Sequence, residues 1–210
     1  MSSVISETPP RGRFITLEGI DGAGKSTHLP WLKDALERAG RRVWVSREPG
    51  GTPVGERLRE MLLHESMSPL AEALLMFAAR REHCERAIWP RLADGTWIVC
   101  DRFADATYAY QGGGHGVALE TIGELERLTL GEFRPDLTVV FDVPVEVSRE
   151  RLATGRELDR FERQRDEFFT RVRATYLQRA RAEPKRMRVI DGTRSPDAVR
   201  AELLPIVEAL

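Results

Sequence analysis

One eight-residue segment constrains the fold of this chain more than any other. Residues 19–26 read GIDGAGKS, which fits the pattern G-x-x-x-x-G-K-[ST], between an apolar stretch, 14–18, and an amphipathic one, 25–39. Glycines let a loop wrap an anion with its backbone N–H groups, and the following helix N-terminus adds positive potential. This order predicts a phosphate-binding loop (P-loop). There Lys25 can reach the β- and γ-phosphates of a nucleotide, and the Ser26 hydroxyl can ligate Mg²⁺.

The rest of the chain alternates short apolar runs with longer amphipathic stretches, which predicts strands joined by crossover helices. The expected strands are 14–18, 42–46, 97–100, 137–143 and 187–190. The expected helices are 25–39, 54–63, 70–92, 118–130, 162–182 and 196–210. We therefore expect an α/β fold of the P-loop nucleotide kinase type, a five-stranded parallel sheet with helices on both faces. It forms one domain, 13–210, after a flexible tail, 1–12.

Charge and composition exclude several classes of partner. The 32 Lys and Arg against 33 Asp and Glu give a net charge of −1, which argues against nucleic acid as a partner but leaves a small anion open. No apolar run approaches the roughly 18 residues of a membrane span, and the start has no signal-peptide core, so we expect a cytoplasmic protein. Cys84 and Cys100 form no Cys-x-x-Cys pair, and no His cluster completes a zinc site.

A P-loop does not define the reaction, because GTPases, motor ATPases and small-molecule kinases share it. The sequence contains no Asn, which excludes the Asn-Lys-x-Asp segment of guanine-specific GTPases. Two arginines follow the second and third expected strands, in 47–52 (REPGGT) and 101–103 (DRF). Guanidinium groups at the carboxyl ends of strands suit phosphate oxygens, so these segments predict a second phosphate site.

With these segments the chain resembles the thymidylate kinases, which phosphorylate dTMP with ATP. The resemblance spans nearly the whole globular chain in the family's order, through 18–27, 47–52, 75–80, 101–111 and 158–162. It implies transfer of the ATP γ-phosphate to dTMP, giving dTDP in dTTP biosynthesis, with Mg²⁺. It also implies a homodimer and a cis peptide bond at Glu48–Pro49.

The resemblance implies roles for individual residues. Those implied to contact ATP are Gly19, Ile20, Asp21, Gly22, Ala23, Gly24, Lys25, Ser26, Thr27 and Arg151. Those implied to contact dTMP are Asp21, Arg47, Phe77, Arg80, Arg102, Thr107, Tyr110 and Gln111. In this set Arg47 and Arg102 hold the phosphate, Phe77 stacks on thymine, and Arg80 bonds to the base. Tyr110 packs where a ribose 2′-hydroxyl would lie, and the metal residues are Ser26 and Asp101.

An arginine-rich segment, 149–165, follows the fourth expected strand and is broken by Thr154-Gly155. Alone, such a mixed-charge run is typical of a solvated helix. Its position favours a mobile lid, because a kinase must exclude water from phosphoryl transfer. Gly22 stands where one family type has a P-loop arginine, so the resemblance implies the bacterial type, in which lid arginines supply that charge. The residues expected to act in catalysis are Lys25, Arg102, Arg156, Arg160 and Asp21.

Two other interpretations stay open at this point. One is a P-loop kinase for another nucleoside monophosphate or for a nucleoside, although the pair Arg47 and Arg102 favours a phosphorylated acceptor. The other is a regulatory module that binds ATP without transferring phosphate, against which the intact Lys25-Ser26 pair argues.

Overall fold

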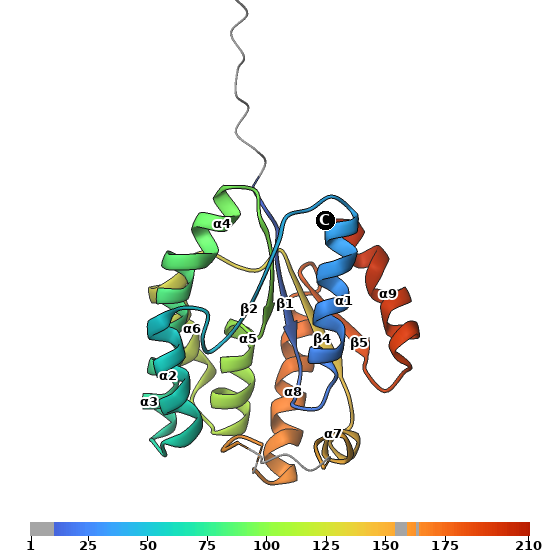
Figure 1. Ribbon diagram of the computed structural model, residues 1–210. Coiled ribbons are helices and arrows are strands. Elements are labelled where there is room, and N and C mark those ends of the chain that lie inside the picture. The colour runs from blue at the N-terminus through green and yellow to red at the C-terminus, as the bar shows by residue number, and fades with distance from the viewer. Residues whose placement is uncertain (1–10, 154–158, 163) are drawn as a thin grey trace, which may run out of the picture.

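The computed structural model describes residues 11–153, 159–162 and 164–210 (Figure 1). Within them the sheet has five strands in the order β2-β3-β1-β4-β5, and every neighbouring pair is parallel. The strands are β1 (Phe14–Glu18), β2 (Val43–Arg47), β3 (Trp97–Asp101), β4 (Leu137–Asp142) and β5 (Met187–Asp191). The expected α/β fold with a parallel sheet is confirmed. Most of the expected tail, 1–12, lies outside the described residues.

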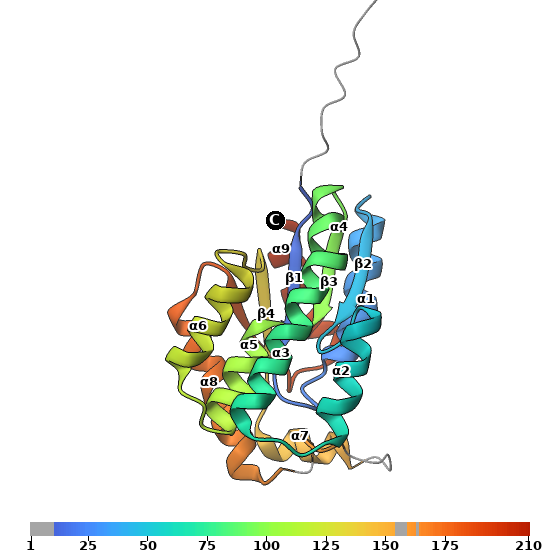
Figure 2. The same cartoon turned by 90° about the vertical axis from the view of Figure 1, so that its left-hand side faces the viewer.

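Helices cover both faces of the sheet, as Figure 1 shows. They are α1 (Lys25–Arg38), α2 (Pro53–His64), α3 (Pro69–His83), η1 (Cys84–Ile88), α4 (Trp89–Ala93), α5 (Ala104–Thr107), η2 (Tyr108–Gly114), α6 (Leu119–Leu130), α7 (Val145–Leu152), α8 (Asp166–Ala182) and α9 (Pro196–Glu208). The helices α1 and α9 pack together on one face, whereas α2 to α6 and α8 lie on the other. Figure 2 shows α3 lying between α2 and α6 on that second face. Among the described residues, no helix has both the length and the apolar character for a membrane crossing.

Three helices begin where the sequence supplies a cap. Thr52, Ser68 and Ser195 accept hydrogen bonds from the backbone N–H groups of the first helical turn, and each is followed by a proline. A hydroxyl at the N-cap satisfies an otherwise unpaired donor, and a proline loses nothing at the first helical position. The starts of α2, α3 and α9 therefore follow from local sequence.

Two helical segments were not predicted, and one begins late. The expected helix 162–182 starts at Asp166, and α7 occupies the first part of the arginine-rich segment. Residues 104–114, which hold three consecutive glycines, are helical as α5 and η2. An added Cβ would lie 2.1 Å from Thr175 Oγ1 at Gly113 and 2.4 Å from the Phe168 ring at Gly114. These glycines are helical because α8 packs directly against them, despite their low helix propensity.

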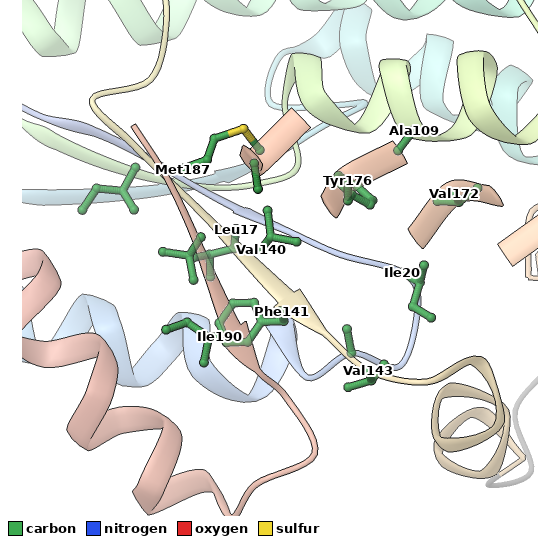
Figure 3. Close-up of a cluster of buried hydrophobic side chains, with 14 of the residues drawn as sticks. Leu17, Ile20, Ala109, Val140, Phe141, Val143, Val172, Tyr176, Met187 and Ile190 are labelled. Carbon is green, nitrogen blue, oxygen red and sulfur yellow. The ribbon is translucent and has the colours of Figure 1, made fainter. Parts of the chain in front are cut away.

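Apolar side chains fill both sides of the central strands. Figure 3 shows Val172 and Tyr176 of α8 near Ala109, with Phe141 and Ile190 beside the helices of the opposite face. The Phe141 ring stacks on His28 of α1, with ring centroids 5.3 Å apart. Because β1 and β4 are covered on both faces, their near-continuous apolar sequences are those of interior strands. The carboxyl ends of β1, β2 and β3 carry the polar residues of the candidate site.

Candidate active site

The P-loop connects β1 to α1 and is held in shape before any ligand binds. Gly22 and Gly24 have left-handed backbone, with φ of 74° and 104°. Lys25 Nζ donates to the carbonyl oxygens of Gly19 and Ile20, at 3.2 Å each. Burial lowers the pKa of Lys25, with nearby Arg102 acting in the same direction. The Lys25 ammonium group therefore lies against the loop and is buried from solvent.

Two adjoining cavities open at this end of the sheet. The larger cavity, about 520 Å³, is lined by the P-loop and the start of α1, together with Arg151 and Gly192. The smaller cavity, about 270 Å³, is lined by residues at the ends of β2 and β3 and by side chains of α2, α3, α5 and η2, together with Asp159, Phe161 and Glu162. The two share Asp21, Lys25, Asp101 and Glu162. A molecule in one cavity can therefore meet a molecule in the other beside these four residues.

Arg102 lies at the centre of the polar network between the strands. Its φ of 69° is the one positive value among the described non-glycine residues. Its guanidinium donates to Gly19 O at 3.1 Å, Asp21 Oδ1 at 2.6 Å and the Tyr110 hydroxyl at 2.8 Å. A strained backbone held by this many contacts is typical of a functional position. The sequence-predicted set Asp21, Arg102 and Tyr110 is thus brought together.

Asp21 is ionised in this network. Burial by itself raises the pKa of its carboxyl, but Arg102, Lys25 and the Tyr110 hydroxyl stabilise the charged form and bring the pKa to about 2. Tyr110 donates to Asp21 Oδ2 at 2.8 Å. A carboxyl with so low a pKa is a poor proton acceptor and a good anchor for cations.

A second pair of arginines lies at the entrance of the smaller cavity. Arg47, at the end of β2, donates to Glu56 at 3.0 Å and is 56% exposed, so its guanidinium can reach a ligand. Arg59 of α2 donates to Pro49 O at 2.9 Å and lines the same cavity. The Glu48–Pro49 peptide bond between them is cis, which confirms the expectation. Arg59 was missed, because only its helix face identifies it.

Arg80 lines the smaller cavity, and one of its donors is unpaired. Its Nε donates to Glu48 at 2.7 Å, and its Nη2 to Phe103 O and to Thr107 Oγ1. Its Nη1 is buried and has no hydrogen-bond partner. Because a buried unpaired guanidinium N–H is costly, Nη1 marks the place of a ligand acceptor.

Phe77 does not line the cavity, and the stacking role expected of it is wrong in this structure. Its side chain is 1% exposed and packs with Tyr108 and Ile122 in the core. Met76, one helical turn before Arg80, lines the cavity instead. A helix turns about 100° per residue, so two adjacent residues point in different directions. Met76 therefore faces the cavity while Phe77 faces the core, and the role was assigned one residue too late.

Thr107 and Gln111 also line the smaller cavity. Gln111 is 1% exposed, and its amide Nε2 donates to Glu72 at 2.7 Å. Both residues come from the segment after β3, which was predicted for substrate contacts. Their placement in the cavity agrees with that prediction, whose substrate role stays a prediction.

Ser26 and Asp101 both line the larger cavity, close to Lys25. Asp101 Oδ1 is buried and has no hydrogen-bond partner. An unpaired carboxylate oxygen beside a hydroxyl fits Mg²⁺, which prefers oxygen ligands and keeps several waters. Among the described residues, no three His, Cys, Asp or Glu side chains cluster as a ready-made metal site.

The lid residues divide into four groups. Arg151 of α7 donates to Gly22 O at 3.2 Å and to Gly192 O at 2.9 Å, so it lies at the larger cavity as expected. Arg160 lines neither cavity; it donates to Leu62 O and pairs with Glu72. Arg156 lies outside the described residues. Asp159, Phe161 and Glu162 line the smaller cavity, and Glu162 lines the larger one as well. They lie in the segment 158–162, which carries part of the resemblance, but were not assigned as site residues.

Asp142 ends β4 but does not enter the site. It accepts two hydrogen bonds from Arg173 of α8, at 2.6 and 2.8 Å. This bidentate pair joins α8 to the sheet, so Asp142 is structural.

Comparison with known proteins agrees with this geometry. The thymidylate kinase family model matches residues 17–203. A protein named thymidylate kinase from Bordetella pertussis is 57% identical over 194 residues, 92% of this chain and 93% of that protein. Another of that name, from Methylobacillus flagellatus, is 57% identical over 197 residues, 94% of this chain and 97% of its own.

A solved structure gives the same result. The crystal structure of thymidylate kinase from Ehrlichia chaffeensis superimposes with a TM-score of 0.78 at 33% identity, covering 95% of this chain and 99% of that one. The range matched by the family model, 17–203, includes every residue that lines the two cavities. The chain belongs to the thymidylate kinase family.

Proposed function

We propose that this chain is a dTMP kinase, which transfers the γ-phosphoryl group of ATP to dTMP and forms ADP and dTDP for dTTP biosynthesis. The observation that carries the proposal is the junction of two cavities at Asp21, Lys25 and Asp101, one on the P-loop and one beside paired arginines. A phosphate oxygen of dTMP attacks the γ-phosphorus, the bond to the β,γ-bridging oxygen breaks, and ADP leaves.

The protein's contribution is positioning and charge neutralisation. ATP lies over the P-loop in the larger cavity, with Lys25 at its β- and γ-phosphates. Arg47, Arg59 and Arg102 bind the phosphate of dTMP from the smaller cavity. Asp21 is not a general base, since its pKa is about 2 and the acceptor phosphate is already anionic. It holds Arg102 and Tyr110 in position by direct hydrogen bonds.

Ser26 and Asp101 would hold Mg²⁺, which when bound supplies positive charge to the phosphates of ATP. The unpaired Asp101 Oδ1 supports this assignment. Arg151 contacts the adenosine end of ATP, beside Gly192. Arg156 and Arg160 remain the proposed lid arginines of the transition state. For Arg160 this requires leaving Glu72, to which it is paired here.

The smaller cavity supports dTMP as the acceptor. The unpaired Nη1 of Arg80 is a donor for a carbonyl oxygen of thymine. Tyr110 is buried, and its ring packs under the Arg102 guanidinium at 4.6 Å, where it leaves little room for a ribose 2′-hydroxyl. These two side chains favour a pyrimidine deoxynucleotide.

The proposal includes a homodimer in the cytoplasm. The large apolar side chains exposed on α2, α3 and α6 are Val54, Met61, Leu70, Leu74, Leu119 and Leu128. These helices lie side by side (Figure 2), so a second copy can cover them. Light scattering on the purified protein tests the oligomeric state. Cys84 and Cys100 are both free thiols, in keeping with a reducing compartment.

The function is tested by ADP release from purified protein with Mg-ATP and one acceptor at a time: dTMP, dUMP, UMP, dCMP, dGMP, AMP or thymidine. We expect strong preference for dTMP, weaker use of dUMP and no use of thymidine. Transfer to a different monophosphate would keep the phosphate sites and discard the base-binding roles. ATP binding without transfer to any acceptor would replace the proposal with the regulatory module.

A further inference from the structure

We propose that Glu72 determines the base specificity of the smaller cavity by fixing the orientation of the Gln111 amide, so that the cavity accepts a thymine-type edge and rejects a cytosine-type edge. This inference rests on the proposed function. Glu72 lies on α3 and lines neither cavity, so it acts through Gln111 as a positioning residue.

The contact between the two side chains has a single chemically sensible polarity. Gln111 Nε2 lies 2.7 Å from Glu72 Oε1, and both side chains are about 1% exposed. An ionised carboxylate only accepts hydrogen bonds, so the amide must turn its NH₂ group toward Glu72. The carbonyl oxygen of Gln111 accepts no hydrogen bond from the described residues and is left for the cavity.

The Glu72 carboxylate has a second partner in Arg160. Arg160 donates to its other oxygen, Oε2, and also to the carbonyl oxygen of Leu62. Arg160 thereby occupies one side of the carboxylate, while Oε1 accepts from Gln111 at 2.7 Å and has His115 Nε2 at 3.7 Å. With Arg160 on Oε2 and Gln111 on Oε1, both oxygens of Glu72 act as hydrogen-bond acceptors in this arrangement.

The cavity then offers one donor and one acceptor to a base. The donor is the unpaired Nη1 of Arg80, and the acceptor is the carbonyl oxygen of Gln111. Thymine and uracil present a carbonyl at C4 and an N–H at N3, which complement this pair. Cytosine presents an amino group at C4 and an N3 nitrogen without a hydrogen. A donor would then face the Arg80 donor, and an acceptor would face the Gln111 carbonyl oxygen. Unpaired buried polar groups discriminate strongly between such substrates.

The E72Q variant tests the inference with dTMP and 5-methyl-dCMP, which differ only at the C4 and N3 edge. In E72Q the introduced carbonyl still accepts from Arg160, and the introduced NH₂ faces Gln111. Gln111 must then turn its carbonyl toward position 72 and its NH₂ toward the base. We expect the ratio of kcat/KM for dTMP over 5-methyl-dCMP to fall at least about tenfold, with the loss on the dTMP side.

Matched variants separate specificity from stability. E126Q makes the same change at another buried glutamate, which accepts from Tyr108 at 2.8 Å and lines neither cavity; its ratio should equal that of the wild type. E72D keeps an ionised acceptor and should retain most of the preference. If E72Q does not fold, E72M gives a second neutral side chain for the same measurement. Equal losses for both nucleotides, or an unchanged ratio, would overturn the inference. Wild-type protein inactive on dTMP would instead overturn the proposed function.

Discussion

The hydroxyl of Tyr176 donates to the carboxylate of Glu18 at 2.7 Å and so joins α8 to the end of β1. The same hydroxyl accepts from the Arg102 guanidinium at 3.1 Å. The other oxygen of Glu18 accepts from the backbone N–H of Phe103, the residue after Arg102, at 2.7 Å. Glu18 therefore holds the backbone just after Arg102 directly, and the Arg102 side chain through Tyr176. None of the three bonds joins residues close in sequence.

The variant Tyr176→Phe removes the hydroxyl while keeping the ring. We expect kcat/KM for dTMP to fall about tenfold, because a hydrogen bond to a charged group contributes about 1.5–3 kcal/mol. Steady-state kinetics and a thermal melt measure the two effects separately. Tyr108→Phe is the control, since its hydroxyl binds Glu126 and touches no site residue. Equal kinetic losses in both variants would refute a specific role for Tyr176.

The pH dependence of stability should report Glu18. Burial, with repulsion from Asp105, raises the pKa of Glu18 from 4.5 to about 7. The folded state therefore holds a proton that the unfolded state has released, and stability is lost as pH rises from about 4.5 through 7. The size of this loss is on the order of 3 kcal/mol.

Glu18→Gln removes that titration. Between pH 4.5 and 7 the unfolding free energy of the wild type, minus that of the variant, should therefore decrease as pH rises. Asp21 has a lowered pKa of about 2, so its stabilisation is present above its ordinary pKa of 3.8 and does not change in this window. Urea unfolding at several pH values measures the difference, and parallel curves for the two proteins would contradict the assignment.

Lys25→Ala should reduce kcat by at least about a hundredfold, because it removes the fixed charge at the transferring phosphate. Binding of dTMP, measured by calorimetry without ATP, should change far less, since the arginines of the smaller cavity remain. Lys33→Ala serves as control, because Lys33 is exposed and pairs only with Glu37 along α1. Near-normal turnover of Lys25→Ala would refute its catalytic role.

Two glycine substitutions should change stability in opposite directions. Gly113→Ala places a Cβ 2.1 Å from Thr175 Oγ1 and 3.0 Å from a backbone oxygen of α8, so α8 must shift, at a cost of about 1–3 kcal/mol. Gly123→Ala, inside α6, meets nothing nearer than 3.4 Å and should stabilise by about 0.5–1 kcal/mol. Denaturant unfolding distinguishes them; a stabilised Gly113→Ala would show that α8 is not tightly packed there.

Much of the site is predictable because it depends on short local patterns. The P-loop needs glycines, a lysine and a hydroxyl at fixed spacing between a strand and a helix, and the structure has them there. Arg47 and Arg102 follow strands, and parallel strands bring their carboxyl ends to one edge. Sequence order alone therefore predicts that these residues meet.

The residues that sequence reasoning missed or misplaced depend on which face of a helix meets the cavity. Met76 and Phe77 are adjacent in sequence, yet one lines the cavity and the other lies in the core. Arg59 and Glu72 look like ordinary helical charges until α2 and α3 are packed. For Arg160 the resemblance implies a lid arginine, and the structure shows it paired with Glu72.

The amino-acid sequence by itself determines the strand–loop–helix order, the caps of three helices and the phosphate chemistry, because each depends on neighbours within a few residues. Tertiary structure alone decides the polarity of the Gln111 amide, the strained backbone of Arg102 and the helical form of the glycines at 112–114. Each of these is imposed by a partner distant in the chain: Glu72 on Gln111, Glu18 on the segment after β3, and α8 on the glycines. Such contacts arise only when the elements pack, since burial removes the water that would otherwise satisfy each group.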